Sequence, residues 1–349
     1  MSTKPLQRIY PYKSDGRYYN YQNEKIEGYL FHMIYEYLRY IKLVKRKTPT
    51  DLMEWVSKPL LTYHYKAEPE IVWIGHSSFL IQIGGINILT DPIFGGSTIF
   101  YRRILPAGVS LEQLPPIHFI LISHNHMDHM DAAALEWLRD QHPGATFLVP
   151  EGDKKWFDAR GFAHVVEHGW WQKYGASKVG RFAENIQFTF LPAVHWSQRS
   201  LFDKNCSLWG SWLIEKDGYT IYFAGDTAYS EHFALIAQEC APIDIALMPI
   251  APCEPRKWMA KTHMGVQESV QAFLDLGARH FVPMHWGTFA FGEDEFDAPL
   301  FLLKDWWYHQ RAHLAGKQMH IVKVGESRTF GLQKQLEVAS ITIFPEKTV

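Results

Sequence analysis

Short apolar runs alternate with helical patterns along most of the chain, and this alternation predicts a mixed α/β protein. Strands are expected at 71–74, 79–83, 86–90, 119–122, 146–149, 164–167, 186–191, 211–216, 219–224, 244–249 and 279–284. Helices are expected at 131–140, 151–159, 231–239, 265–276 and 298–314. Gly84-Gly85 and Asp217-Gly218 each predict a tight hairpin between two strands. Hairpins mixed with helix–strand alternation favour an α/β sandwich with two central sheets and helices outside.

The first 66 residues differ from the rest of the chain. They carry 12 Lys and Arg against 6 Asp and Glu, and they hold 11 of the 17 Tyr. Apolar residues at three- and four-residue spacing over 26–44 predict an amphipathic helix, which Thr48-Pro49 ends. This helix either packs on the main domain or lies at a membrane interface. We therefore divide the chain into a basic, Tyr-rich extension, 1–66, and a single domain, 67–349.

Bulk properties narrow the function further. The formal net charge is −2, so no nucleic-acid partner is expected. The three cysteines show no paired spacing, which argues against a disulfide framework. The N-terminus lacks the apolar stretch of a secretory signal, and no apolar run is long enough to span a membrane. We expect a cytoplasmic protein, with peripheral attachment to a membrane as the alternative.

One stretch, SHNHMDHMD at 123–131, follows an apolar run and precedes a helical pattern. It places His124, His126, Asp128 and His129 within six residues. Imidazole and carboxylate are ligands that suit zinc and similar divalent metals. The alternative is a polar turn whose residues form only local hydrogen bonds, and four potential ligands within six residues argue against it.

Other candidate ligands recur at strand ends. Asp91, His195, Asp226 and His285 each come just after an apolar strand run, as His124 does. Singly, such a histidine is more often structural, and Asp226 in Gly-Asp-Thr could be turn chemistry. Strand ends at one edge of a sandwich converge in space, so their joint occurrence predicts a shared metal site.

The whole pattern resembles the metallo-β-lactamase fold superfamily: HxHxDH, a strand-end His, a strand-end Asp and a late His. Between 72 and 290 the chain is more specifically similar to N-acyl-phosphatidylethanolamine-hydrolysing phospholipases D, and to their bacterial relatives. The motifs that carry this similarity are GHSS (75–78), LTDPIF (89–94), LPPI (114–117), SHNHMDHMD, HWSQRSLFD (195–203), LWGSW (208–212), FAGDT (223–227), EPRKWM (254–259) and HWGTFA (285–290). The resemblance implies a four-layer αββα sandwich.

The resemblance also implies two zinc ions, although iron or manganese suits the same ligands. One ion would be held by His124, His126 and His195, the other by Asp128, His129 and His285, with Asp226 bridging them. Asp91 is a candidate acceptor that orients a ligand histidine through its other ring nitrogen. The alternative is that Asp91 serves only as a turn residue before Pro92.

A phospholipid at a membrane surface is the substrate that the resemblance implies, and a homodimer is the implied assembly. A metal-bridging hydroxide would release phosphatidic acid and an N-acylethanolamine. Asp128 and His263 are the candidate catalytic residues; His263 would protonate the leaving oxygen or hold the phosphate, unless its bonds are only local. Candidate substrate contacts are Trp196, Arg199, Arg256 and His263. The Trp-rich loop 196–212 is a candidate aromatic lid over the site. Arg256 could instead form a structural ion pair.

Three other functions compete with this one. The first is a lactonase or phosphodiesterase of the same fold that acts on a small soluble substrate. The second is a metal-dependent nuclease, which the near-neutral charge disfavours. The third is a non-enzymatic, membrane-associated protein stabilised by zinc. A closed structural zinc site needs four ligands, whereas seven candidates are present, which favours catalysis.

Overall fold

Two seven-stranded sheets form the centre of the molecule. The computed structural model describes residues 6–22, 52–57, 61, 65–95, 103–175 and 185–331. In spatial order, one sheet contains β16 (Ser327–Thr329), β3 (Glu70–Gly75), β4 (Ser78–Ile83), β5 (Ile86–Thr90), β6 (Phe119–Leu121), β7 (Thr146–Pro150) and β8 (Val165–His168). The other contains β15 (Gln318–Met319), β14 (His280–Met284), β13 (Ile245–Pro249), β12 (Tyr219–Phe223), β11 (Ser211–Lys216), β10 (Gln187–Leu191) and β9 (Lys173–Gly175). The helix predicted at 26–44 lies outside the described residues.

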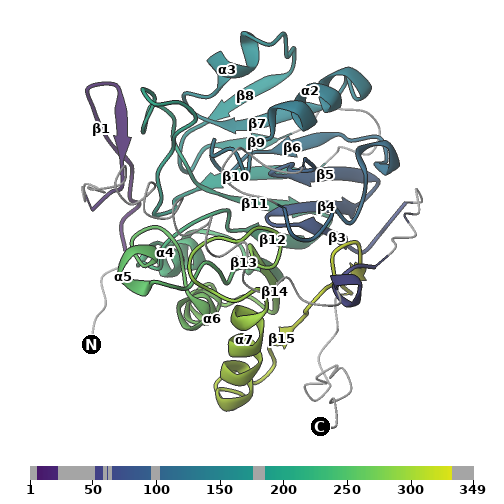
Figure 1. Cartoon of the computed structure of the whole chain (residues 1–349). Helices are drawn as coiled ribbons and strands as arrows, with labels where there is room; N and C mark the ends of the chain where they lie inside the picture. The colour runs from purple at the N-terminus through teal and green to yellow at the C-terminus, as the bar shows by residue number, and fades with distance from the viewer. Residues whose placement is uncertain are drawn as a thin grey trace.

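Helices cover the outer faces of both sheets (Figure 1). On one side lie α2 (Ala132–Gln141) and α3 (Lys154–Asp158); on the other lie α4 (His232–Glu239), α5 (Arg256–Met259), α6 (Val266–Asp275) and α7 (Ala298–His309). Short 3₁₀ helices occur at Leu52–Trp55 and Leu111–Gln113. The fold is therefore the expected four-layer αββα sandwich. None of the helices described has the length and apolar character that a membrane crossing requires.

Alternation along the strands separates two hydrophobic cores. Ile71 and Trp73 of β3 point into the core between the sheets, whereas Val72 and Ile74 point to the outer core. Leu135 of α2 packs in that outer core, as do Leu138 and Phe157. Because successive strand residues face opposite sides, a strand buried on both faces must be apolar throughout. This explains why the strand runs were continuous rather than alternating.

Both predicted hairpins are present. Gly84 and Gly85, with φ of 55° and 77°, join β4 to β5. Asp217 and Gly218, with φ of 51° and 85°, join β11 to β12. Two consecutive positive φ values are what a two-residue primed turn requires, and Gly and Asp tolerate them best.

Strand direction brings the candidate ligands to one edge. β3 and β5 are each antiparallel to β4 and so point the same way, and β6 is parallel to β5. In the other sheet β10 and β12 are both antiparallel to β11, while β13 and β14 run parallel to β12. The carboxyl ends of β3, β5, β6, β10, β12 and β14 precede His76, Asp91, His124, His195, Asp226 and His285. Ligands commonly bind at such carboxyl ends.

The described part of the N-terminal extension packs on the domain. Its hairpin, β1 (Tyr12–Ser14) and β2 (Arg17–Tyr19), is drawn in purple at the edge of Figure 1. Tyr18 is buried, and its backbone N–H donates to Asn205 O at 2.8 Å. Trp171 Nε1 donates to Ile9 O at 2.7 Å. The division of the chain at residues 66 and 67 stays a prediction.

Candidate metal centre

Three histidines form the first half of the site. His124 Nε2 and His195 Nε2 lie 2.8 Å and 3.2 Å from His126 Nδ1. His124 and His126 come from the loop after β6, and His195 follows β10 in the other sheet. One nitrogen of each ring converges with the other two within 4.8 Å, which is a donor set that a divalent metal can use.

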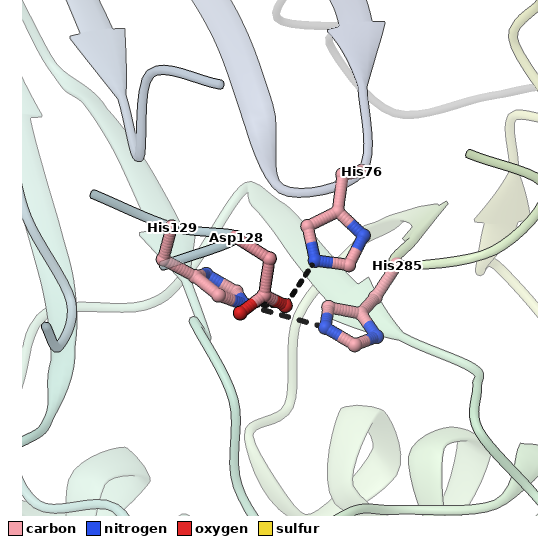
Figure 2. A group of neighbouring side chains, drawn as sticks. All are labelled: His76, Asp128, His129 and His285. Atoms are coloured by element: carbon pink, nitrogen blue, oxygen red, sulfur yellow. Dashed lines mark hydrogen bonds and ion pairs between the residues drawn. The ribbon is translucent and has the colours of Figure 1, made fainter. Parts of the chain in front are cut away.

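The second half lies beside it and contains one residue more than predicted. Asp128, His129 and His285 meet as expected, and His76 joins them (Figure 2). The Nε2 atoms of His129 and His285 are 3.3 Å apart. His76 Nε2 donates to Asp128 Oδ2 at 2.9 Å, and the rings of His76 and His285 lie 3.9 Å apart between centroids.

Asp226 stands between the two halves. Its Oδ1 is 3.0 Å from His285 Nε2 and its Oδ2 is 3.3 Å from His129 Nε2. The same Oδ2 is 3.9 Å from His195 Nε2 and 4.0 Å from His124 Nε2. A carboxylate that faces ligands of both sets has the position that bridging requires. These eight residues, the seven predicted ligands and His76, are called the metal centre below.

Protein acceptors on the outer ring nitrogens fix how the histidines point. His195 Nδ1 donates to Thr262 O at 2.8 Å, and His285 Nδ1 donates to Ala251 O at 2.9 Å. A carbonyl can only accept, so Nδ1 carries the proton and Nε2 turns a lone pair to the centre. This arrangement fits metal ligation, because a ligating imidazole must offer a lone pair.

Asp91 orients one histidine of each half. Its Oδ2 accepts from His129 Nδ1 at 2.8 Å and from Ser123 Oγ at 2.5 Å, and its Oδ1 accepts from Ser123 N at 2.7 Å. Ser123 Oγ in turn accepts from His124 Nδ1 at 2.9 Å. The contact predicted for Asp91 is therefore present, and a serine extends it to a second ligand.

The protonation states of the histidines and carboxylates favour a cation bound in the metal centre. Burial lowers the pKa of His126 to about 3 and that of His195 to about 4, so both rings are neutral near pH 7. Burial opposes the charge of Asp128 and Asp226, yet neighbouring imidazoles outweigh it and hold both carboxyl pKa values well below the usual range. Burial likewise opposes the charge of His129, but the two carboxylates raise its pKa well above the ordinary value.

His76 lies in the GHSS motif and follows the end of β3, but it was not among the predicted ligands. Its backbone lies in the left-handed region at φ 54°, as do those of Asp91 at 31° and His285 at 65°. Such conformations cost free energy and persist only where surrounding contacts hold them. His76 N donates to Thr288 Oγ1 at 2.6 Å, and His285 N donates to His76 O at 3.1 Å. The strand-end rule applied to residue 76 would have found it.

Two predicted substrate contacts are already engaged with the metal loop. Arg199 Nη1 donates to Asn125 O at 3.0 Å and to Met130 O at 2.7 Å, so it braces the loop from His124 to His129. The ring of Trp196 lies 4.3 Å from that of His126. Direct contact of either side chain with substrate stays a prediction.

His263 lies beside Asp226. Its Nδ1 atom is 3.6 Å from Asp226 Oδ2, and this atom has no hydrogen-bond partner among the described residues. Arg256 holds this segment in place, since its Nη2 donates to His263 O at 2.7 Å and to Glu268 Oε2 at 2.6 Å. The structure thus shows the structural ion pair considered for Arg256, and its contact with substrate stays a prediction.

The aromatic lid expected at 196–212 is wrong, because all three of its tryptophans, Trp196, Trp209 and Trp212, are buried. Trp209 and Trp212 are fully buried in the core between the sheets. Trp209 Nε1 donates to Asn20 Oδ1 at 3.0 Å, and Trp212 Nε1 donates to Ile122 O at 2.8 Å. A strand, β11, begins at Ser211, so alternation turns Trp212 inward.

Comparison with known proteins agrees with this geometry. Residues 86–286 match the family model described as the beta-lactamase superfamily domain. The chain belongs to this superfamily. With its buried His and Asp cluster, this superfamily member is a metal-dependent hydrolase.

Named relatives exist in two eukaryotes. The chain is 32% identical over 245 residues to N-acyl-phosphatidylethanolamine-hydrolyzing phospholipase D 1 of Caenorhabditis elegans, covering 67% of this chain and 68% of that protein. It is 34% identical over 245 residues to the mitochondrial N-acyl-phosphatidylethanolamine-hydrolyzing phospholipase D of Saccharomyces cerevisiae. That match covers 67% of this chain and 51% of the yeast protein, so the chain spans about half its length.

A solved structure shares the fold. Igni18, a metallo hydrolase from Ignicoccus hospitalis, superposes with a TM-score of 0.58 at 23% identity. The similarity covers 76% of this chain and 99% of that protein. At this identity the comparison supports the fold of this chain alone.

Proposed function

We propose that the protein is a zinc-dependent phosphodiesterase that hydrolyses N-acyl-phosphatidylethanolamine-type phospholipids. The products would be phosphatidic acid and an N-acylethanolamine. The observation that carries this proposal is the meeting of two donor sets on Asp226, with His263 facing the same carboxylate. The activity printed in the names of the worm and yeast relatives supports the choice of substrate.

The residues that would hold the metals are already oriented. His124, His126 and His195 would hold one ion; Asp128, His129 and His285 would hold the other; Asp226 would be shared. Bound divalent metals act as Lewis acids toward a phosphoryl oxygen. They also lower the pKa of a coordinated water to about 7. Thr262 O, Ala251 O and Asp91 keep the ligand rings from rotating, so donor positions are set before substrate binds.

His263 is suited to contact the substrate phosphate or its leaving oxygen. Burial lowers its pKa well below the ordinary value, so the ring is neutral and carries one N–H. It can donate that hydrogen bond without adding a charge that would repel metals. Its main chain is held by Arg256 and by its own N–H, which donates to Met259 O at 2.8 Å. The side chain is then positioned independently of substrate.

Hydrolysis of the phosphodiester requires a proton for the departing alkoxide. The bond from phosphorus to the N-acylethanolamine oxygen breaks as the bond to the water oxygen forms. The proton lost by that water balances the one gained by the alcohol product. In this proposal His263 relays the proton: one ring nitrogen takes up the proton of the water as the other gives its N–H proton to the leaving oxygen, so the ring starts and ends neutral.

Metal analysis combined with a substrate panel tests the proposal. The panel contains N-acyl-phosphatidylethanolamine in detergent micelles, bis(p-nitrophenyl) phosphate and an acyl homoserine lactone. We expect metal-dependent release of N-acylethanolamine from the lipid. Asp128→Asn should lower kcat at least about 100-fold, since it replaces an anionic ligand with a neutral amide and weakens the hydrogen bond from His76.

Asp305→Asn is the matched control, because Asp305 is exposed on α7 and pairs only with His309 in the part of the chain described. It should leave kcat unchanged. Activity in metal-free protein, or full activity of Asp128→Asn, would overturn the mechanism. Hydrolysis of the lactone in preference to both phosphodiesters would establish the lactonase instead, and no turnover by metal-loaded protein would establish the non-enzymatic alternative.

A further inference from the structure

Leu201 and Phe202 form an apolar tip beside the metal centre. Their exposed fractions, 80% and 87%, exceed those of all other large apolar side chains that the structure describes. They lie in the loop between β10 and β11, six and seven residues after His195. A single exposed apolar side chain is ordinary on a protein surface, whereas adjacent ones form a contiguous patch that can serve as an interaction site.

The tip is built by its own turn. Asp203 Oδ1 accepts from Arg199 N at 3.0 Å and from Ser200 N at 2.8 Å. Asn205 N donates to Ser197 O at 2.7 Å, which closes the base of the loop. The turn therefore uses its polar groups internally and holds the two apolar side chains outward.

The turn is attached directly to the metal loop. Arg199, at its start, donates to Asn125 O and Met130 O. These two carbonyls flank Met127, a further exposed apolar side chain. The tip therefore sits at the rim of the metal centre, and whatever surface it binds is held close to the site.

Two cations, Arg17 and Lys204, lie at the base of the tip, where the carboxylate of Asp203 is engaged by the backbone of the turn. Arg17, from the N-terminal hairpin, donates to Phe202 O at 3.5 Å and also to Lys204 O. Burial lowers the pKa of Lys204, and the charge of Arg17 lowers it further, which shows that the two cations lie close together. Cations beneath an apolar tip match an anionic interface, where apolar groups insert and cations meet head groups.

A second segment at the site has the same chemistry. Trp258 of α5 is exposed, with Lys257 Nζ and Lys261 Nζ at 5.4 Å and 6.0 Å from its ring. This segment leads into His263. Tryptophan and lysine are typical of membrane interfaces, because each side chain joins an apolar body to a polar end.

We propose that Leu201 and Phe202 insert into an anionic lipid surface and hold the metal centre against it. This inference rests on the proposed function for its choice of lipid rather than protein as the partner. The anchor would bring the metal centre, with His263, close to substrate that stays in the bilayer. It assigns the N-terminal hairpin a supporting role, through Arg17, rather than the role of the anchor itself.

Vesicle co-sedimentation of the full chain tests the inference. Leu201→Ser/Phe202→Ser is compared with Phe301→Ser/Leu302→Ser, which changes the same residue types on α7, where they are 57% and 42% exposed. Vesicles contain phosphatidylcholine with or without phosphatidylglycerol. We expect the tip variant to lose about tenfold or more in partitioning to the anionic vesicles, and the α7 variant to match the wild type. Higher salt should weaken wild-type binding.

Two further measurements separate the outcomes. Turnover of bis(p-nitrophenyl) phosphate and the melting temperature should be the same for both variants and the wild type. Equal vesicle binding by the tip variant and the wild type would overturn the inference, as would equal losses in both variants. Self-association of the wild type that the tip variant lacks, without lipid binding, would assign the tip to a second copy of the chain. Vesicle binding without lipid hydrolysis would overturn only the proposed function.

Discussion

Asn20 holds the main chain of His195 from both sides. Its Nδ2 donates to His195 O at 3.1 Å, and its Oδ1 accepts from His195 N at 3.2 Å. The same Oδ1 accepts from Trp209 Nε1 at 3.0 Å. A buried side chain of the N-terminal extension, 175 residues away in sequence, thus fixes a predicted metal ligand.

Replacing Asn20 should therefore weaken metal binding without contacting the metal. Asn20→Ala leaves the N–H and C=O of His195 without these partners, which costs about 1–3 kcal/mol and corresponds to about fivefold or more in metal affinity. Competition with a chelating dye measures the affinity. Gln22→Ala, an exposed change in the same segment, should have no effect; equal affinities for Asn20→Ala and wild type would contradict the role of Asn20.

His76 should matter through Asp128. His76→Ala removes the hydrogen bond to Asp128 Oδ2, and loss of such an outer partner typically lowers metal affinity or activity about 10–100-fold. His76→Gln keeps an N–H donor and should recover part of the loss. The measurement is kcat at saturating metal together with metal affinity. His309→Ala, exposed on α7, is the control, and no difference between His76→Ala and this control would refute the contribution.

Asp91 should support both stability and ligation. It is fully buried and accepts three hydrogen bonds, so Asp91→Asn sets an amide N–H against donors from Ser123 and His129. Unpaired buried donors cost about 1–3 kcal/mol each, and we expect a loss of about 3 kcal/mol in unfolding free energy. Urea denaturation measures it. Asp140→Asn, at an exposed surface pair, should change stability by less than about 0.5 kcal/mol.

His232 should make stability fall as pH falls. Burial lowers its pKa from 6.5 to about 3 in the folded protein, so below pH 6.5 the unfolded chain takes up a proton that the folded chain does not. Stability from this group is therefore complete above pH 6.5 and declines toward pH 3. Between pH 7.5 and 5.5 the expected loss is about 1 kcal/mol.

His232→Leu should remove that part of the slope. Urea denaturation at a series of pH values compares the variant with the wild type. His309→Gln serves as the control, since His309 is exposed on α7. A variant with the wild-type slope between pH 7.5 and 5.5 would show that His232 is not the group responsible.

The sequence alone predicted the order of the main strands and helices, because each bears a local signal. Continuous apolar runs mark strands buried on both faces, and the Gly84-Gly85 and Asp217-Gly218 pairs mark turns that need positive φ. Short elements such as β9 and α5 carry too few residues for a period to appear, and they were missed. Helix α7 ends at His309, five residues before the expected end at 314.

The seven candidate ligands could be found from sequence because each follows an apolar strand or lies in the dense 123–131 stretch. Their meeting, by contrast, depends on strand direction within each sheet, which hydrogen-bond pairing decides, and on how the two sheets pack together. The partners that orient them were also beyond local patterns: Asn20 lies far away in the chain, and Thr262 and Ala251 act through backbone carbonyls that any residue possesses. Residue types reveal which side chains can ligate, whereas only tertiary structure decides which nitrogen of each ring faces the metal centre.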